Sequence, residues 1–179
     1  MAQTGSKRSQ LFRLHSDPMT AEGHIASVES TVQQLLSEIQ QLPADVLYRE
    51  PAPGEWPVMT TLAHLAELLP YWSHEAADLA ASPGKVVGRT HEDPQRLGAI
   101  EQHGHDSLAD IVPSIRAALD ECLATLRGIP SESWSAVGQH VRGGPITPDE
   151  LVSRFVVNHA REHADQIHAT LQALRTAKA

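Results

Sequence analysis

Apolar residues recur every three or four positions along four long stretches of this chain, the spacing of one face of an α-helix. The stretches cover residues 20–42, 57–81, 107–127 and 147–175. In the second stretch, steps of four and three alternate, as in helices that pack nearly parallel to their neighbours. The sequence therefore predicts an all-α fold, a four-helix bundle.

Residues that start and stop helices support these limits. Pro43 ends the first stretch, and Gly128 follows the third. Before the fourth, Thr147 is a natural N-cap, Pro148 suits a first helical position, and Glu150 completes a capping box. We therefore expect the fourth helix to begin at this point.

Two segments lack a helical period. Residues 1–19 are polar and irregular, and we expect a flexible N-terminal arm there, with residues 20–179 as a single domain. Residues 82–106 carry glycine, proline, charges and three histidines. We expect this segment to be a long crossover connection without regular structure, so that the bundle is not simply up and down.

The charge balance argues against several kinds of partner. The formal net charge is −8, from 22 acidic and 14 basic residues, and this repels nucleic acid and anionic membranes. No apolar run approaches the roughly 20 residues of a membrane helix. The single cysteine, Cys122, gives no disulfide framework, and we expect it in the core. With no signal-peptide pattern at the N-terminus, the sequence predicts a cytoplasmic protein.

Two histidines stand four residues apart in "NHAREHA", residues 158–164. Since the chain has 11 histidines, chance alone gives roughly 0.6 such pairs, so the spacing by itself is weak evidence. The apolar stripe of this stretch consists of Val152, Phe155, Val156, Ile167 and Leu174. His159 and His163 fall in its middle and are predicted to be buried. Either hydrogen bonds across the core or a shared metal ion would satisfy them.

A metal site needs a third ligand, for which His64 in "TLAHLAE" is the best candidate. It lies roughly 110° from the seam of the second helix, where it faces either a third helix or the solvent. The other histidines are expected to be solvent-exposed or off the strongest apolar faces. They are His15, His24, His74, His91, His103, His105, His140 and His168.

The order of "GEWPVMTTLAHLAELL" and "GGPITPDELVSRFVVNHAREHADQI" after a first helix resembles the DinB/YfiT-like superfamily over residues 22–175. The resemblance implies a four-helix bundle with an unusual crossover. It also implies a divalent metal ion held by three histidines, which match His64, His159 and His163 here. Members often form homodimers and include thiol S-transferases and metal-dependent hydrolases.

Three imidazoles leave a coordination position open for water or a thiol. We therefore expect a metal-dependent transferase or hydrolase acting on a small molecule, with a low-molecular-weight thiol as a candidate co-substrate. Zinc or nickel is expected first, with iron or manganese as alternatives. The sequence assigns no further catalytic residue.

The alternative is a non-catalytic metal-binding bundle with a stress-response or interaction role. A structural metal would need a fourth protein ligand. The acidic candidates, all also consistent with solvated charge, are Glu67, Glu75, Glu162 and Asp165.

The crossover 82–106 is expected to border the metal site and to influence substrate choice, with a solvated surface loop as the alternative. Its polar side chains are Arg89, His91, Glu92, Asp93 and Arg96. The two arginines among them are predicted to be exposed. If the crossover is only a connector, specificity would depend on the surroundings of Trp56 and Tyr71.

Overall fold

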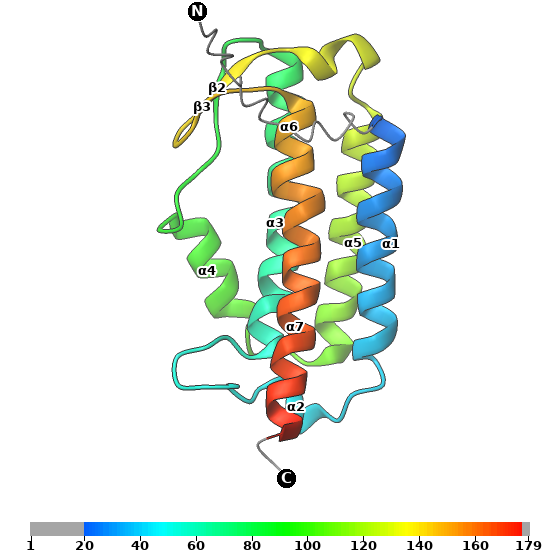
Figure 1. Ribbon diagram of the computed structural model, residues 1–179, viewed down its shortest axis with the longest axis vertical. Coiled ribbons are helices and arrows are strands. Elements are labelled where there is room, and N and C mark those ends of the chain that lie inside the picture. Colours follow the sequence, from blue (N-terminus) through cyan, green and yellow to red (C-terminus); the bar gives the residue numbers. More distant parts are fainter. Residues whose placement is uncertain (1–19, 177–179) are drawn as a thin grey trace, which may run out of the picture.

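Four long helices form the bundle in the computed structural model, which describes residues 20–176 (Figure 1). They are α1 (Ala21–Ile39), α3 (Val58–Ala81), α5 (Leu108–Arg127) and α7 (His159–Thr176). A short helix, α6 (Pro148–Val152), leads into α7 through the turn η2 (Ser153–Asn158). The predicted four-helix bundle is confirmed, while the expected arm 1–19 lies outside the described residues.

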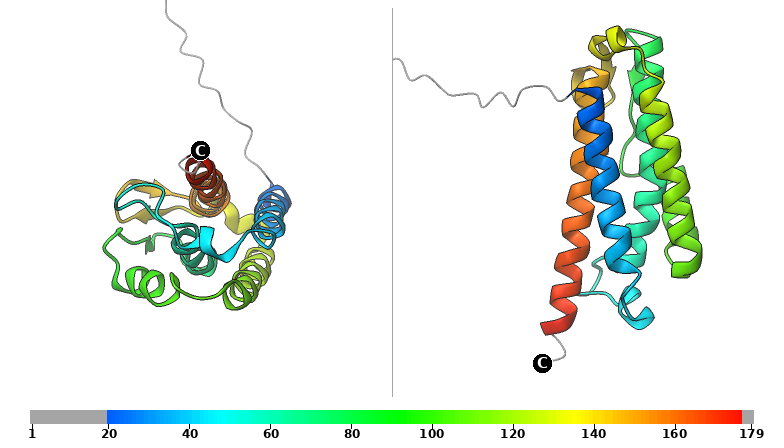
Figure 2. Two further views of the ribbon diagram at one scale, coloured as in Figure 1. Left: turned by 90° about the horizontal axis from the view of Figure 1, so that it is seen from below. Right: turned by 90° about the vertical axis from the view of Figure 1, so that its right-hand side faces the viewer.

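The helices α1 and α7 run in one direction, and α3 and α5 run in the other (Figure 1). Seen end-on, the four occupy the corners of a bundle in which α1 packs on α5 and α7, and α3 packs on the same two (Figure 2). Because α3 and α5, which follow each other among the long helices, are parallel, the chain between them must return along the whole bundle. The long crossover follows from this topology.

Side-chain caps fix the helix starts that position the site. The hydroxyl of Thr20 accepts a hydrogen bond from the Gly23 amide at the start of α1. At α6, the Thr147 hydroxyl accepts from the Glu150 amide, and the Glu150 carboxylate accepts from the Thr147 amide. This is the capping box that the sequence predicts, and it satisfies two backbone donors that would otherwise lack partners.

The core is built from apolar side chains of all four long helices. Examples with no exposed surface are Ile39, Leu62, Ile115 and Ile167. Each such side chain stabilises the fold by about 1.5–3 kcal/mol relative to leaving it in water. Cys122 is also fully buried, as expected. Among residues 20–176, no helix is both long enough and apolar enough to cross a membrane.

The crossover 82–106 contains regular structure, so the expectation of a structureless connection is wrong. It holds β1 (Val86–Val87) and α4 (Pro94–His103), which packs on α3 outside the bundle (Figures 1 and 2). The helix has no buried residue, and this explains why its sequence shows no apolar period. Its start is capped by Asp93, whose carboxylate accepts from the Arg96 amide.

A small sheet ties the crossover to the segment before α6. Strand β1 pairs in parallel with β2 (Gly138–His140), which pairs antiparallel with β3 (Gly144–Ile146). A single 3-10 turn, η1 (Ser131–Ser135), precedes β2. The sheet therefore holds two connections, distant in sequence, against the same end of the bundle.

The fourth helix is not uniformly α-helical, because η2 is a π-helical turn. Such turns are rare and often lie at functional sites. In the wider turn the adjacent Val156 and Val157 are both fully buried, while Phe155 is half-buried. The sequence predicted one continuous α-helix here, since apolar spacing does not distinguish the two geometries over a single turn.

Candidate metal centre

The three predicted ligands come together between α3 and α7. One nitrogen from each of His64, His159 and His163 lies within 4.8 Å of the other two. The ring centroid of His64 is 5.5 Å from that of His159 and 4.9 Å from that of His163. These separations suit three nitrogens around a single cation.

The ligands are also shielded from solvent. His64 is 2% exposed, so the alternative of a surface position for it is wrong. His163 is buried, and His159 is half-buried at the edge of the cluster. The indole of Trp56, in the loop before α3, meets the His64 ring edge to face at 5.7 Å. Neighbouring helices therefore carry the cluster, and a loop covers it.

The hydrogen bonding of His163 fits a metal ligand. Its Nδ1 lies 2.9 Å from Gln166 Oε1, an acceptor, so Nδ1 carries the proton and Nε2 keeps a lone pair. Nε2 is buried and has no hydrogen-bond partner among the described residues. A buried imidazole nitrogen without a partner is unfavourable, and a metal ion would satisfy it.

His64 has a comparable neighbour three residues later on its helix. Its Nδ1 lies 3.3 Å from Glu67 Oε2, a close contact that does not have hydrogen-bond geometry. The other carboxylate oxygen of Glu67 pairs with Arg89 of the crossover. Arg89 also lies 3.5 Å from Asp93 and stacks over the ring of Tyr71 at 3.7 Å. Glu67 therefore links a predicted metal ligand to the crossover.

This arrangement corrects two sequence-based expectations. The Arg89 side chain is only 7% exposed, so the prediction of an exposed arginine is wrong for this residue. Glu67 is not a solvated charge, because it is enclosed between His64 and Arg89. A sequence signal for both orienting groups existed: Glu67 and Gln166 each follow a histidine by three positions, one helical turn.

The remaining acidic candidates do not approach the cluster. Glu75 accepts a hydrogen bond from the Gly88 amide, and Glu162 and Asp165 are exposed. Within residues 20–176, the three histidines are the one group of three or more His, Cys, Asp or Glu side chains close enough to share a cation. No carboxylate belongs to this group. A bound cation would thus keep an open coordination position, the mark of a catalytic zinc-type site.

The surroundings keep the three imidazoles neutral. Burial lowers the pKa of His159 to about 3 and that of His163 to about 4. The pKa of His64 is also lowered, chiefly by burial. The neighbouring imidazoles and the Arg96 guanidinium act in the same direction. Neutral rings have free lone pairs at pH 7, as metal coordination requires.

The metal-free protein should lose stability as the pH falls from about 6.5 towards 4. In this window the unfolded chain protonates its histidines near pH 6.5, while folded His159 and His163 stay neutral until about pH 3 and 4. The unfolded state then binds more protons, and the free energy of unfolding should drop by a few kcal/mol. Urea unfolding of chelator-treated protein, repeated at several pH values across this range, measures the free energy of unfolding. The double variant His159→Asn, His163→Asn should show a shallower dependence; an equal slope would contradict the prediction.

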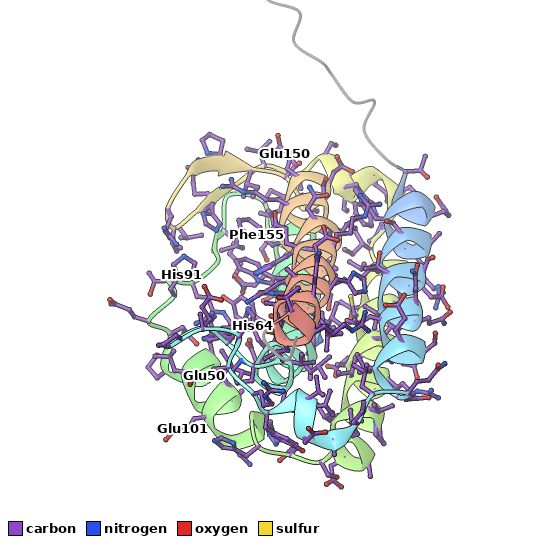
Figure 3. All side chains as sticks on the ribbon, turned by 60° about the horizontal axis from the view of Figure 1, so that its bottom comes forward. Glu50, His64, His91, Glu101, Glu150 and Phe155 are labelled. Carbon is purple, nitrogen blue, oxygen red and sulfur yellow. The ribbon has the colours of Figure 1, made fainter. Side chains whose placement is uncertain are left out.

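A cavity of ≈330 Å³ adjoins the cluster and is lined by His64 and His159. Three rings form one of its walls: Phe155 stacks on Trp72 at 4.3 Å and on His140 at 5.0 Å. In Figure 3, His64 and Phe155 lie within the bundle, whereas His91 lies on the crossover at the periphery. The crossover therefore borders the site, as predicted, while the aromatic wall was not foreseen because its members come from α3, β2 and η2.

The wall requires a glycine in the crossover. Gly88 has φ of +94°, a backbone conformation that favours glycine. A Cβ added there would meet His140 Nε2 at 2.7 Å. The crossover can approach His140 this closely only without a side chain at position 88.

Two other histidines differ from expectation. His24 is 1% exposed, with Nε2 2.8 Å from Asp149 Oδ1 and its ring stacked on Trp134. The prediction of an exposed His24 is wrong because Asp149, at the start of α6, and Trp134, in η1, contact its ring. His140 is half-buried in the cavity wall, so the prediction of an exposed loop residue is wrong there too.

The other histidines lie away from the cluster. His103 is half-buried and contacts Asp106 at 2.7 Å. Four are exposed, as expected: His74, His91, His105 and His168. His15 lies outside the described residues.

Comparison with known proteins gives a family-level match. The sequence model of the DinB superfamily matches residues 27–167. No curated protein sequence matches the chain. The sequence relationship is therefore visible through the pattern of the superfamily as a whole.

Solved structures of similar fold include YfiT from Bacillus subtilis, described as a probable metal-dependent hydrolase with an unusual four-helix bundle topology. It is 14% identical with a TM-score of 0.71, and the match covers 95% of this chain and 93% of YfiT. A mycothiol-dependent maleylpyruvate isomerase is 14% identical with a TM-score of 0.59, over 80% of this chain and 60% of the isomerase. A third structure, described as a four-helix bundle protein, is 15% identical with a TM-score of 0.61, over 84% of this chain and 99% of that protein. At these identities the likeness shows the shared fold.

Proposed function

The chain belongs to the DinB superfamily, and from this premise we propose that it is a metal-dependent enzyme that activates a thiol or a water molecule for attack on a small molecule. The observation that carries the proposal is the open cluster of His64, His159 and His163 beside a cavity. The buried, unpartnered Nε2 of His163 adds to it, because a metal ion would satisfy this atom.

The three histidines would hold one divalent cation, with zinc or nickel expected first and iron or manganese as alternatives. When bound, such a cation lowers the pKa of a water or thiol at its open position and so supplies a nucleophile near neutral pH. No further catalytic residue is assigned.

The chain's own residues would prepare this chemistry. Gln166 and Glu67 orient the rings of His163 and His64. Trp56 and the aromatic wall of Trp72 and Phe155 limit the access of water. The cavity leaves room for a small substrate next to His64 and His159.

Thiol transfer and hydrolysis are both compatible with an open three-histidine site. Structural neighbours include a mycothiol-dependent isomerase and a probable metal-dependent hydrolase. These names support a small-molecule substrate and a low-molecular-weight thiol as a candidate partner. Association into a homodimer, a cytoplasmic location and a single domain over residues 20–179 stay predictions.

A metal-loaded sample and a chelated sample should separate the enzyme from a non-catalytic bundle. We expect thiol-transfer or hydrolytic activity that disappears on chelation and returns with metal, while the circular dichroism of the helices is retained. Both activities are measured on one preparation, with mycothiol as the thiol. Cooperative unfolding on chelation, without activity in the loaded protein, would instead indicate a structural metal.

A further inference from the structure

The cavity beside the histidine cluster is lined by four arginines and by no acidic side chain. The arginines are Arg89, Arg96, Arg142 and Arg154. The whole chain carries 22 acidic and only 14 basic residues. A cavity of ≈330 Å³ that gathers four of those basic residues therefore has the opposite charge to the rest of the protein.

The four arginines differ in what they already bind. Arg89 is paired with Glu67 and Asp93 and stacked on Tyr71, so its charge is compensated within the protein. Its role is to hold the crossover against α3. It is not available as the main contact for a ligand.

Arg96 is half-buried and only partly engaged. Its Nη1 donates a hydrogen bond to the His91 carbonyl at 3.0 Å, and its guanidinium lies 5.6 Å from the centre of the Trp56 ring. No ion pair found among residues 20–176 includes it. It therefore supplies positive charge near the histidines that no carboxylate balances directly.

Arg142 lies in the turn between β2 and β3, and Arg154 lies in η2 beside Phe155 of the aromatic wall. Both are exposed, and neither takes part in an ion pair within the described part of the chain. The Arg154 guanidinium lies 5.0 Å from the centre of the Phe155 ring. After burial, these two arginines are the main cause that lowers the pKa of His140. Their charge thus acts on the cavity wall itself.

We propose that this cavity binds a small organic anion, with its acidic group on Arg142 and Arg154 and its carbon skeleton along Trp72 and Phe155. Guanidinium groups bind carboxylates and phosphates through paired, charge-assisted hydrogen bonds. A cavity of ≈330 Å³ is at the small end of ligand sites and suits one small acid. The inference rests on the proposed function, for which it names the substrate class.

Isothermal titration with defined probes tests the inference on both metal-loaded and chelator-treated protein. The probes are fumarate, inorganic phosphate and the neutral fumaramide. We expect fumarate or phosphate to bind and fumaramide to bind at least about tenfold more weakly, because a charge-assisted contact is lost. Tighter binding of fumarate assigns a carboxylic acid, and tighter binding of phosphate assigns a phosphate ester; both support an anion site.

The double variant Arg142→Gln, Arg154→Gln should weaken binding of the anionic probe about tenfold with unchanged metal content. A matched control is Arg116→Gln, Arg127→Gln, which removes the same charge from exposed positions on α5 outside the cavity. The inference is overturned if no anionic probe binds, or if the two double variants bind equally. Metal-dependent activity on neutral substrates alone would contradict the anion site and support the proposed function. Anion binding that depends on the arginines, in a protein without activity, would support the anion site and contradict the proposed function.

Discussion

Replacing His163 by alanine should remove nearly all bound metal. The variant loses an imidazole nitrogen that is buried without a hydrogen-bond partner in the cluster, and two of the three histidines remain. Residues that only orient a ligand already contribute about 10–100-fold to metal affinity, so loss of a ligand itself should weaken binding by more than about 100-fold. Elemental analysis and competition with a chromogenic chelator measure this.

A matched control is available on the same helix. His168→Ala removes an exposed histidine that pairs with Glu38 at 2.6 Å, away from the cluster. This variant should keep wild-type metal content. If His163→Ala retained as much metal as His168→Ala, the assignment of the three-histidine site would be wrong.

Glu67→Ala should weaken metal binding by about 10–100-fold and also destabilise the fold. The affinity falls because the carboxylate beside His64 Nδ1 is lost. Stability falls because Arg89 stays buried without its main partner, a change that costs about 3–5 kcal/mol for a buried pair. The Asp93 contact at 3.5 Å should reduce that loss. Chelator competition and urea unfolding give the two quantities.

Two control variants separate the effects. Glu162→Ala removes an exposed acidic residue next to His163 and should change neither quantity. Gln166→Ala removes the acceptor of His163 Nδ1. Unlike Glu67, Gln166 is uncharged and has no buried charged partner among residues 20–176, so this variant should weaken metal binding without the large loss of stability. Wild-type affinity in both Glu67→Ala and Gln166→Ala would show that these contacts do not tune the ligands.

The sequence was sufficient for the features that depend on local pattern. Helical periodicity and the capping box at Thr147 gave the four long helices, and the resemblance gave the third candidate ligand, His64. Each of these features depends on residues within one or two helical turns of each other, or on a sequence motif. The three histidines then meet because α3 and α7 are neighbours in the bundle.

Features that depend on a distant partner could not be read from the sequence. His24 is buried against Asp149, which lies 125 residues later in the chain. Arg89 looked like a solvated charge because its partner Glu67 belongs to another element. The helix α4 was missed for a different reason: with no buried residue, it has no apolar stripe to recognise.

The π-helical turn η2 separates two functions that share one helix. Arg154 and Phe155 lie inside it, at the cavity wall, and the predicted ligands His159 and His163 follow it. The wider turn accommodates one residue more than ordinary α-helix, and if the same six residues were wound as α-helix, everything after them would rotate by about 100° relative to what precedes them. The angle between the aromatic wall and the predicted metal ligands is thus set by the π-helical winding of a single turn.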